Sequence, residues 1–292
     1  MDRKKFIKTS ILGTSIFAAS PLLARVLDND IDELKPLEPV GFNHIPTTNS
    51  AIAENAVLHT SESRGLADHG WLVSRHTFSF ANYHNPERMN FGVLRVLNDD
   101  RVNQGMGFGK HPHDNMEIVT IPMKGAVAHE DSMGTNGIIN AGDVQIMSAG
   151  SGIYHSEFNA SQTEGLELFQ IWVMPKLKNI TPRYDQRTYN PADFKGQWKT
   201  VVSPLGTDID SLQVNQDTYF NITEIAEGES LSYALHGAQQ GAFVFVIEGG
   251  IEVAGENLGR RDAIGISQTD TIEVKASAAG TKVLLIEVPM VW

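Results

Sequence analysis

Short hydrophobic or alternating runs, separated by turn residues at roughly ten-residue spacing, extend from Val57 to the end of the chain. Runs of this length, broken by Gly, Asn and Asp, are typical of strands in a β-sandwich or β-barrel. No long helical period accompanies them. The pattern therefore predicts an all-β protein. The clearest runs are residues 71–73, 91–97, 118–123, 144–147 and 166–173.

The same pattern occurs twice along the chain. Residues 243–255, FVFVIEGGIEVAG, have the same order of strand, glycine and strand as residues 119–129, VTIPMKGAVAH. Internal similarity of this kind is typical of a duplicated fold. We therefore expect two tandem β-barrels, one over residues 57–182 and one over residues 183–292.

The N-terminus has the order of a targeting segment. Residues 1–24, MDRKKFIKTSILGTSIFAASPLLA, are basic at first, then mildly hydrophobic, then rich in small residues. This order predicts a secretory signal peptide, and the segment is too short and too weakly hydrophobic for a typical membrane span. Its start resembles a twin-arginine signal, with Lys4 in place of the second arginine. We expect cleavage after Ala24 and export to the periplasm, without membrane insertion afterwards.

An uncleaved N-terminal membrane anchor is the alternative for this segment. Residues 25–56 contain scattered Pro, Asn and acidic residues with little periodicity, and we interpret them as a linker.

Composition narrows the chemistry. The chain has 292 residues, a net charge of −12 and no cysteine. Nucleic-acid binding requires a basic surface that displaces counterions, so this acidic chain is not expected to bind DNA or RNA directly. The absence of cysteine excludes disulfides, thiol catalysis and thiolate metal ligands. Any metal would therefore be held by nitrogen and oxygen ligands.

Two pairs of side chains have the spacing of metal ligands on strands. His111 and His113 precede a run rich in strand-forming residues, and His155 and Glu157 follow a glycine-rich turn further along. Residues i and i+2 of a β-strand project from the same face, about 7 Å apart. Three imidazoles and one carboxylate from two strands would suit one divalent first-row transition metal and leave open positions for a substrate.

The histidine pairs lie within longer segments that resemble a known family. The spacing Gly105-x5-His111-x-His113-x3-Glu117 follows the first motif of the cupin superfamily, whose members are small jelly-roll barrels. More narrowly, the chain is similar to the pirins, a family of bicupins, from about Val57 to its end. The matching segments include HGW at 69–71, HTFSFANY at 76–83, RVLNDD at 95–100, DSMG at 131–134, QIWV at 170–173 and TPRY at 181–184.

The resemblance implies a bicupin of two tandem jelly-roll barrels with a metal in the first. It also implies that His111, His113, His155 and Glu157 are the ligands, in agreement with the spacing. In many other cupins the carboxylate ligand stands at the position of Glu117, which is therefore a second candidate, as a ligand or as a neighbour of the ligands. The family favours Fe(II), although Cu, Mn, Co, Ni or Zn would also accept these donors.

Within that family the chain resembles the bacterial pirin-like proteins that are credited with quercetin 2,3-dioxygenase activity. The resemblance thus implies a metal-dependent dioxygenase that cleaves flavonols such as quercetin with O2 and releases carbon monoxide. Coordination to the metal would lower the pKa of the flavonol 3-hydroxyl, and Glu157 is the candidate catalytic base for its proton. A planar substrate also needs a hydrophobic slot. Candidates for its walls, or alternatively for the barrel core, are Phe78, Phe80, Phe108, Met147 and Phe169.

Two other functions are consistent with the same residues. One is a non-catalytic pirin-type protein whose metal site senses redox state and whose surface binds a partner. The other is a cupin that acts on a different phenolic substrate or catalyses an isomerisation. Three further polar residues, His76, His129 and Asp131, are interpreted either as neighbours of the site or as ordinary turn and surface residues.

The second half is expected to lack a metal site. An ungapped alignment of the two halves places Leu235, Gly237, Val274 and Ala276 opposite the four candidate ligands. His236 is interpreted as a structural or surface residue. We expect the protein to be a monomer.

Overall fold

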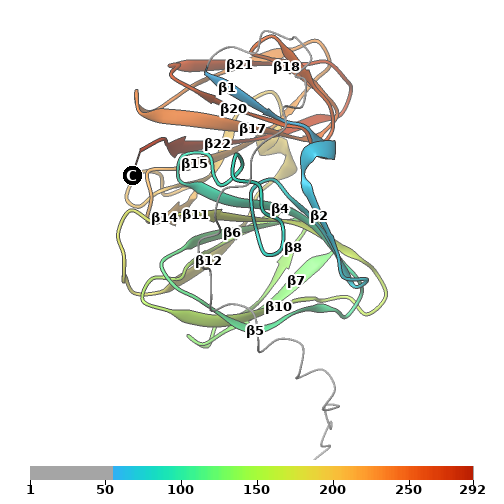
Figure 1. The fold of residues 1–292 in the computed structure, drawn as a ribbon, viewed down its shortest axis with the longest axis vertical. Helices are drawn as coiled ribbons and strands as arrows, with labels where there is room; N and C mark the ends of the chain where they lie inside the picture. Colours follow the sequence, from blue (N-terminus) through green and yellow to red (C-terminus); the bar gives the residue numbers. More distant parts are fainter. Residues whose placement is uncertain (1–54, 292) are drawn as a thin grey trace, which may run out of the picture. The chain divides into compact units, whose positions relative to one another are not determined.

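The computed structural model describes residues 55–291 of the chain (Figure 1). The predicted signal peptide and nearly all of the predicted linker lie outside the described residues. Within them the chain forms 22 β-strands and two short 3₁₀ turns, η1 (Ser61–Ser63) and η2 (Pro191–Phe194), and no α-helix. The predicted all-β fold is confirmed. No helix among residues 55–291 has the length and hydrophobicity needed to cross a membrane.

Each half of the described chain consists of a seven-stranded and a four-stranded sheet. In the first half the large sheet has the order β12-β9-β6-β11-β4-β3-β2 and the small sheet the order β5-β10-β7-β8. The large sheet comprises β2 (Gly65–Asp68), β3 (Leu72–His76), β4 (Leu94–Val102), β6 (Glu117–Lys124), β9 (Asp143–Ser148), β11 (Leu166–Val173) and β12 (Arg183–Thr188). The small sheet comprises β5 (Gly107–His113), β7 (Ala126–Asp131), β8 (Asn136–Asn140) and β10 (Ile153–Asn159).

The second half repeats this arrangement, with the orders β1-β20-β17-β22-β15-β13-β14 and β16-β21-β18-β19. Its large sheet comprises β1 (Ala56–His59), β13 (Lys199–Pro204), β14 (Leu212–Val214), β15 (Tyr219–Ile225), β17 (Gln240–Glu248), β20 (Ala263–Ser267) and β22 (Thr281–Pro289). Its small sheet comprises β16 (Ser230–Ala234), β18 (Ile251–Val253), β19 (Glu256–Leu258) and β21 (Thr271–Ala276).

The expectation of closed barrels is wrong for the described strands. In each half the large and small sheets are separate, and no ladder of backbone hydrogen bonds among residues 55–291 joins one to the other. Side chains hold the two sheets together instead. In the first half, Val102 and Leu168 of the large sheet pack with Val127 and Ile139 of the small sheet. Each half is therefore a sandwich of two sheets, and its interior is filled from both faces.

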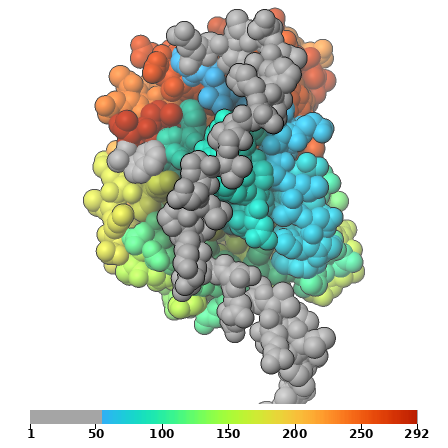
Figure 2. Space-filling view, in the orientation of Figure 1, coloured from blue at the N-terminus to red at the C-terminus, as the bar shows by residue number. Residues whose placement is uncertain are grey.

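The halves exchange edge strands. Strand β1, which precedes the whole first half in the sequence, pairs with β20 in the large sheet of the second half. Conversely, β12 lies beyond residue 182 but pairs with β9 in the first half. In Figure 2 the blue residues accordingly extend from the green first half to the orange second half. The domain boundary at residue 182 stays a prediction, and strand pairing crosses it in both directions.

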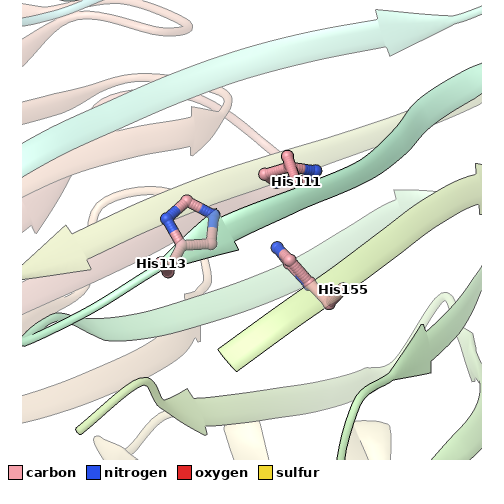
Figure 3. A group of neighbouring side chains, drawn as sticks. All are labelled: His111, His113 and His155. Carbon is pink, nitrogen blue, oxygen red and sulfur yellow. The ribbon is translucent and has the colours of Figure 1, made fainter. Parts of the chain in front are cut away.

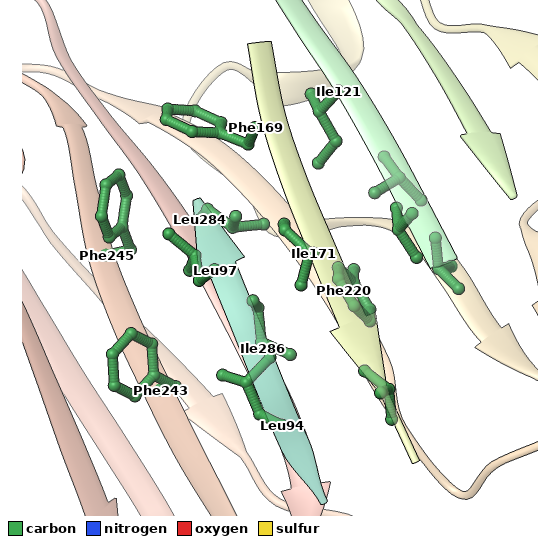
Figure 4. Packing of buried hydrophobic residues seen from close by; sticks show 14 of the residues in the cluster. Leu94, Leu97, Ile121, Phe169, Ile171, Phe220, Phe243, Phe245, Leu284 and Ile286 are labelled. Carbon is green, nitrogen blue, oxygen red and sulfur yellow. The ribbon is translucent and has the colours of Figure 1, made fainter. Parts of the chain in front are cut away.

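A hydrophobic cluster joins the two large sheets. It draws on β4, β6, β9 and β11 of the first half and on β13, β15, β17 and β22 of the second (Figure 4). Four phenylalanines that are fully buried form much of it: Phe169, Phe220, Phe243 and Phe245. Phe169 and Phe245 meet edge to face with their ring centroids 5.2 Å apart. The large sheets therefore form the two inner layers, and the small sheets cover their outer faces.

This contact assigns a role to each face of the central strands, because side chains alternate along a strand. On β6, Val119 and Ile121 belong to the cluster between the halves. Thr120, between them, hydrogen-bonds instead to Glu157 of the small sheet. On β11, Phe169 faces the other half, whereas Gln170 also bonds to Glu157. Polar side chains of the large sheet are thus aimed at one place in the first sandwich.

Replacing Leu97 by Ala should lower the free energy of unfolding by about 2–5 kcal/mol, because it leaves a cavity in the cluster that both halves share. Leu97 is 0% exposed. Leu177→Ala is the matched control, since Leu177 is 60% exposed, and it should change stability by less than about 0.5 kcal/mol. Chemical denaturation measures both variants. Equal losses would contradict the assignment of this cluster as the shared core.

Candidate metal centre

Two antiparallel strands of the small sheet bring three histidines together. His111 on β5 is the direct partner of His155 on β10, and His113 is the partner of Ile153. The three rings converge, as Figure 3 shows, with centroid distances of 4.4 Å for His111–His155, 4.9 Å for His111–His113 and 5.0 Å for His113–His155. One nitrogen of each lies within 4.8 Å of the others. The i, i+2 spacing thus places these imidazoles around a common point.

A bulge in β5 adjusts the register next to this cluster. His155 pairs with His111, but Glu157 pairs with Phe108, so two residues along β10 correspond to three along β5. Gly107 permits the close approach that follows, because a Cβ atom at this position would overlap the Glu157 carbonyl oxygen and the Phe158 Cα atom. Bulges of this kind re-aim side chains beside functional sites.

The hydrogen bond of His111 selects the nitrogen that is free for a metal. Its Nδ1 lies 2.7 Å from the carbonyl oxygen of Gly109. A carbonyl oxygen only accepts, so Nδ1 carries the proton and Nε2 presents its lone pair. A donated ring N–H of this kind is the usual second contact of a metal-bound histidine.

The unpaired ring nitrogens of His155 are the strongest indication that this cluster binds a metal. His155 is 1% exposed, and neither ring nitrogen has a hydrogen-bond partner among the described residues. Buried polar groups are normally paired. Burial, with the neighbouring imidazoles, lowers the pKa of His155 to about 2 and that of His113 to about 4, and burial also lowers the pKa of His111. All three are therefore neutral near pH 7 and are available as ligands.

Glu157 lies beside the cluster in a polar but enclosed position. Gln170 donates to its Oε2 from 2.8 Å, and Thr120 donates to its Oε1 from 3.3 Å. Burial raises the pKa of Glu157 to about 7, with a smaller contribution from the nearby Asp100. Its carboxylate groups with His129 and His155, within 4.8 Å, rather than with His111 and His113. The predicted ligands thus form two overlapping groups that share His155.

His129 belongs to the second group, although its sequence context left its role open. It lies on β7 opposite Glu157 and is 1% exposed. Its Nε2 lies 3.2 Å from Asp131 Oδ2, and its Nδ1 has no partner among the described residues. Tyr184 packs on its ring at a centroid distance of 4.7 Å. The signal was the i, i+2 spacing of His129 and Asp131, which repeats that of the two recognised pairs.

Glu117, the second carboxylate candidate, belongs to neither group of potential metal ligands among residues 55–291. Ser148 Oγ donates to its Oε2 from 2.6 Å, and the backbone N–H of Asn215, from the second half, donates from 3.2 Å. Glu117 starts β6 in the large sheet, whereas His113 ends β5 in the small one. Asn115 between them has a φ of 45°. The chain changes sheet there, so parity counted from His113 does not apply.

The hydrophobic candidates separate into two sets. Phe78 and Phe169 pack in the cluster between the halves, so for these two the alternative of a core position holds. Phe108 packs against Trp71 instead, in the cluster that also holds Leu168. Phe80 meets Trp172 edge to face at 5.3 Å, and Trp172 packs against the cluster that contains Met147. The Trp172 ring in turn meets His113 edge to face at 4.8 Å.

The structure places two further polar residues that the sequence left open or did not indicate. His76 is buried on β3, where its Nδ1 lies 2.8 Å from Asn98 Oδ1. Its ring lies 5.2 Å from that of Phe80, and its Nδ1 lies 3.2 Å from Ser74 Oγ. Asp100 is buried on β4 and accepts a hydrogen bond from Ser74. Burial raises the pKa of Asp100 to about 7.

In the second half, His236 has a different setting. Its Nδ1 lies 2.8 Å from Oε2 of the buried Glu287, and its ring stacks on Tyr219 at 3.7 Å. Tyr233 donates to the same Glu287 oxygen from 2.6 Å. Among residues 55–291, both groups of three or more potential metal ligands lie in the first half.

Comparison with known proteins follows the same division into halves. The Pirin family profile matches residues 58–173, and the profile of the quercetinase C-terminal cupin domain matches residues 200–288. Quercetin 2,3-dioxygenase of Escherichia coli strain K12 is 42% identical over 234 residues, which are 80% of this chain and 99% of that protein. A pirin-like protein of Caulobacter vibrioides is 41% identical over 212 residues, 73% of this chain and 90% of that one.

Solved structures agree with the sequence matches. The crystal structure of YhhW from Escherichia coli, 42% identical, has a TM-score of 0.77 and covers 81% of this chain and 98% of its own. The crystal structure of bacterial pirin YhhW in complex with nickel(II), 41% identical, has a TM-score of 0.76 and covers 81% and 100%. With this identity over most of both chains, and with two cupin-type halves, the chain belongs to the pirin family.

Proposed function

We propose that this protein is a metal-dependent dioxygenase that cleaves flavonols with O2, opens the heterocycle and releases carbon monoxide. The observation that carries the proposal is the convergence of three imidazoles, His111, His113 and His155, beside the buried carboxyl of Glu157. The name of the Escherichia coli relative, quercetin 2,3-dioxygenase, supports the substrate class.

The donor set fits a divalent transition metal. The nitrogens of His155 have no partner in the described protein, and His111 is oriented by a backbone carbonyl. We propose His111, His113 and His155 as ligands, with Glu157 as the fourth, and Fe(II) as the native metal. The nickel(II) complex of the Escherichia coli pirin is consistent with a set of nitrogen and oxygen donors that accepts several such ions. When bound, the metal would act as a Lewis acid that lowers the pKa of the flavonol hydroxyl.

Glu157 is the proposed base. A carboxylate beside the proposed metal ligands is a group that can accept the proton of a flavonol hydroxyl. Gln170 and Thr120 hold its two oxygens from the opposite sheet, so the carboxylate is fixed before the substrate arrives. Deprotonation of the flavonol 3-hydroxyl by Glu157 would produce the electron-rich enolate that reacts with O2.

The hydrophobic side of the site is the proposed support for the flavonol rings. Trp172 meets His113 at one edge and Phe80 at another, and Met147 and Ile153 pack close by. His111 and His113 are half-buried, whereas His155 is buried. We propose that the substrate approaches from the side of His111 and His113 and lies against Trp172.

The location of the reaction is a separate proposal. We propose that residues 1–24 export the chain to the periplasm, where it acts as a monomer on a small aromatic substrate.

Quercetin cleavage should require a bound metal and Glu157. Glu157→Gln should lower kcat by about 10²–10⁴-fold, because it removes the base while keeping the shape of the side chain. His111→Ala should abolish turnover because it removes a ligand. The measurement is flavonol loss and carbon monoxide release by protein reloaded anaerobically with one metal at a time.

Glu117→Gln is the matched control for this experiment, since Glu117 is an equally buried carboxyl that faces the other half. It should retain turnover and metal content. Tight metal binding with no carbon monoxide from any loading would reject the dioxygenase proposal in favour of a non-catalytic pirin-type protein.

The metal-free protein should lose stability as pH rises, because Glu157 binds its proton more tightly when folded. The pKa of a glutamate side chain in the unfolded chain is 4.5, and the pKa of Glu157 in the folded protein is about 7. The stabilisation by the neutral carboxyl is complete below pH 4.5 and is lost as pH rises through 7. The loss amounts to about 3 kcal/mol, from 1.36 kcal/mol per pKa unit.

Glu157→Gln removes this titration, so above pH 7 the metal-free variant should be more stable than the wild type. The two should converge towards pH 4.5. Denaturant unfolding at several pH values, with a chelator present, measures the difference. If the unfolding free energies of the two proteins change with pH in parallel, the pKa of Glu157 is not raised by folding.

A further inference from the structure

A cavity of about 230 Å³ lies where the two halves meet and shares no residue with the histidine cluster. Residues of η1, β3 and β4 line it on one side, and the turn before β20 lines it on the other. Five of its lining residues are arginines, in a chain whose net charge is −12. They are Arg64, Arg75, Arg101, Arg260 and Arg261.

The cavity is the polar continuation of the cluster between the halves. On β3 and β4, Arg75 pairs with Asp99 and Val73 pairs with Arg101. Asp99 lies two residues beyond Leu97, on the face that packs against the second half. On the next strand the partner of Asp99 is Phe169. The hydrophobic contact therefore ends in a cavity lined by arginines at this edge.

Two of the arginines are buried and come from different parts of the chain. Arg64 is 6% exposed and Arg261 is 4% exposed. Arg64 Nη1 donates to Asp99 Oδ2 from 3.3 Å, and Arg261 Nε lies 3.5 Å from the same oxygen. The Arg261 guanidinium lies over the Phe169 ring, 4.7 Å from its centroid. One carboxylate oxygen thus serves two enclosed cations.

Several donors of these two side chains remain unused. Arg64 Nε and Arg261 Nη1 are shielded from solvent and have no hydrogen-bond acceptor in the described part of the chain, and the contact of Arg261 Nε with Asp99 is an ion pair without hydrogen-bond geometry. Arginine stays charged when buried, and a buried charged donor without an acceptor is costly. These N–H groups therefore indicate an acceptor that the chain does not itself supply.

The carboxylates that line the cavity are fewer than the arginines that line it. The two lining carboxylates are Glu62, which is exposed, and Asp99, which is shared as described. Glu248, outside the lining, pairs with Arg260 at 2.7 Å and with Arg261 at 3.6 Å. Asp262 accepts from the backbone N–H of Ser61 at 2.6 Å and of Gly259 at 2.9 Å. Among the lining residues there are thus five arginines and two carboxylates, and Glu248 and Asp262 lie at the margin.

We propose that this cavity binds a small oxyanion that carries a phosphate group. The guanidinium fork matches phosphate oxygens in a bidentate manner, and such charge-assisted bonds are the strong ones. At about 230 Å³ the cavity is smaller than the usual sites for drug-sized ligands, so it suits inorganic phosphate or a short phosphate monoester. The anion accepts from Arg64 of the first half and Arg261 of the second, and so links the halves.

Isothermal titration of the full metal-loaded chain with orthophosphate, and separately with glycerol phosphate, tests the proposal at constant ionic strength in chloride. The expected result is saturable binding of one anion per chain and a thermal midpoint that rises with its concentration. Similar affinity for both probes identifies the free anion as the ligand. An affinity for the monoester at least about tenfold higher identifies a phosphorylated small molecule.

Arg261→Gln and Arg64→Gln should each weaken binding by at least about tenfold. Since both side chains are buried between the halves, Arg75→Gln combined with Arg101→Gln provides a second test that spares the interface. This double variant should fold normally and bind the anion more weakly. Arg187→Gln, on β12 outside the cavity, is the matched control and should bind as the wild type does.

No saturable binding of either probe by the wild type would overturn the proposal. Unchanged binding by the folded double variant would overturn it equally, because the anion would then be held elsewhere. All of these experiments measure anion binding or unfolding rather than turnover. Their results therefore do not depend on whether the protein is a dioxygenase.

Discussion

The hydrophobic cluster between the two large sheets determines which side chains are free for chemistry. Because side chains alternate along a strand, the packing of Val119 and Phe169 against the second half turns Thr120 and Gln170 towards the small sheet. Those two residues hold Glu157, and Glu157 shares its strand with His155. The histidine cluster is therefore supported from behind by a contact that involves none of the proposed ligands.

The two halves have the same sheets but different interiors. In the second half, the space between the sheets is filled by Val244, Val246, Ile264, Leu285 and similar residues. In the first half, the corresponding space holds imidazoles, carboxyls and amides next to smaller hydrophobic clusters. A sandwich with a polar interior buries less hydrophobic surface, and hydrophobic burial is the main favourable term in folding. The second half supplies that burial, which lets the first half keep a polar cluster.

Much of this arrangement could be predicted from local sequence. Alternation within a strand placed His111 and His113 together, and it placed His155 and Glu157 on one face. The same rule failed for Glu117, since the chain leaves one sheet and enters another at Asn115, and periodicity does not continue across such a turn.

Features that depend on contacts between distant segments were beyond the sequence. Phe78 and Phe169 are residue types that could line a substrate slot. Which side of a sheet meets the other half depends on the whole fold, and it places both in the shared core. The grouping of His129 with His155 depends on the order β5-β10-β7, in which neighbouring strands are not consecutive. The arginine cavity arises only when η1 and the turn before β20 meet.

The exchange of edge strands has a consequence for synthesis on the ribosome. The first half is complete once β12 has emerged, but β1 has to wait for β20, and the contact between Asn55 and Ser267 spans 212 residues. Until then an N-terminal strand with unsatisfied backbone groups accompanies a half that is otherwise able to fold, and such strands are prone to pair with other chains. A strand made near the end of synthesis, β20, therefore pairs with the first strand of the described residues, and a chain that ends before Ala263 would leave β1 without its partner.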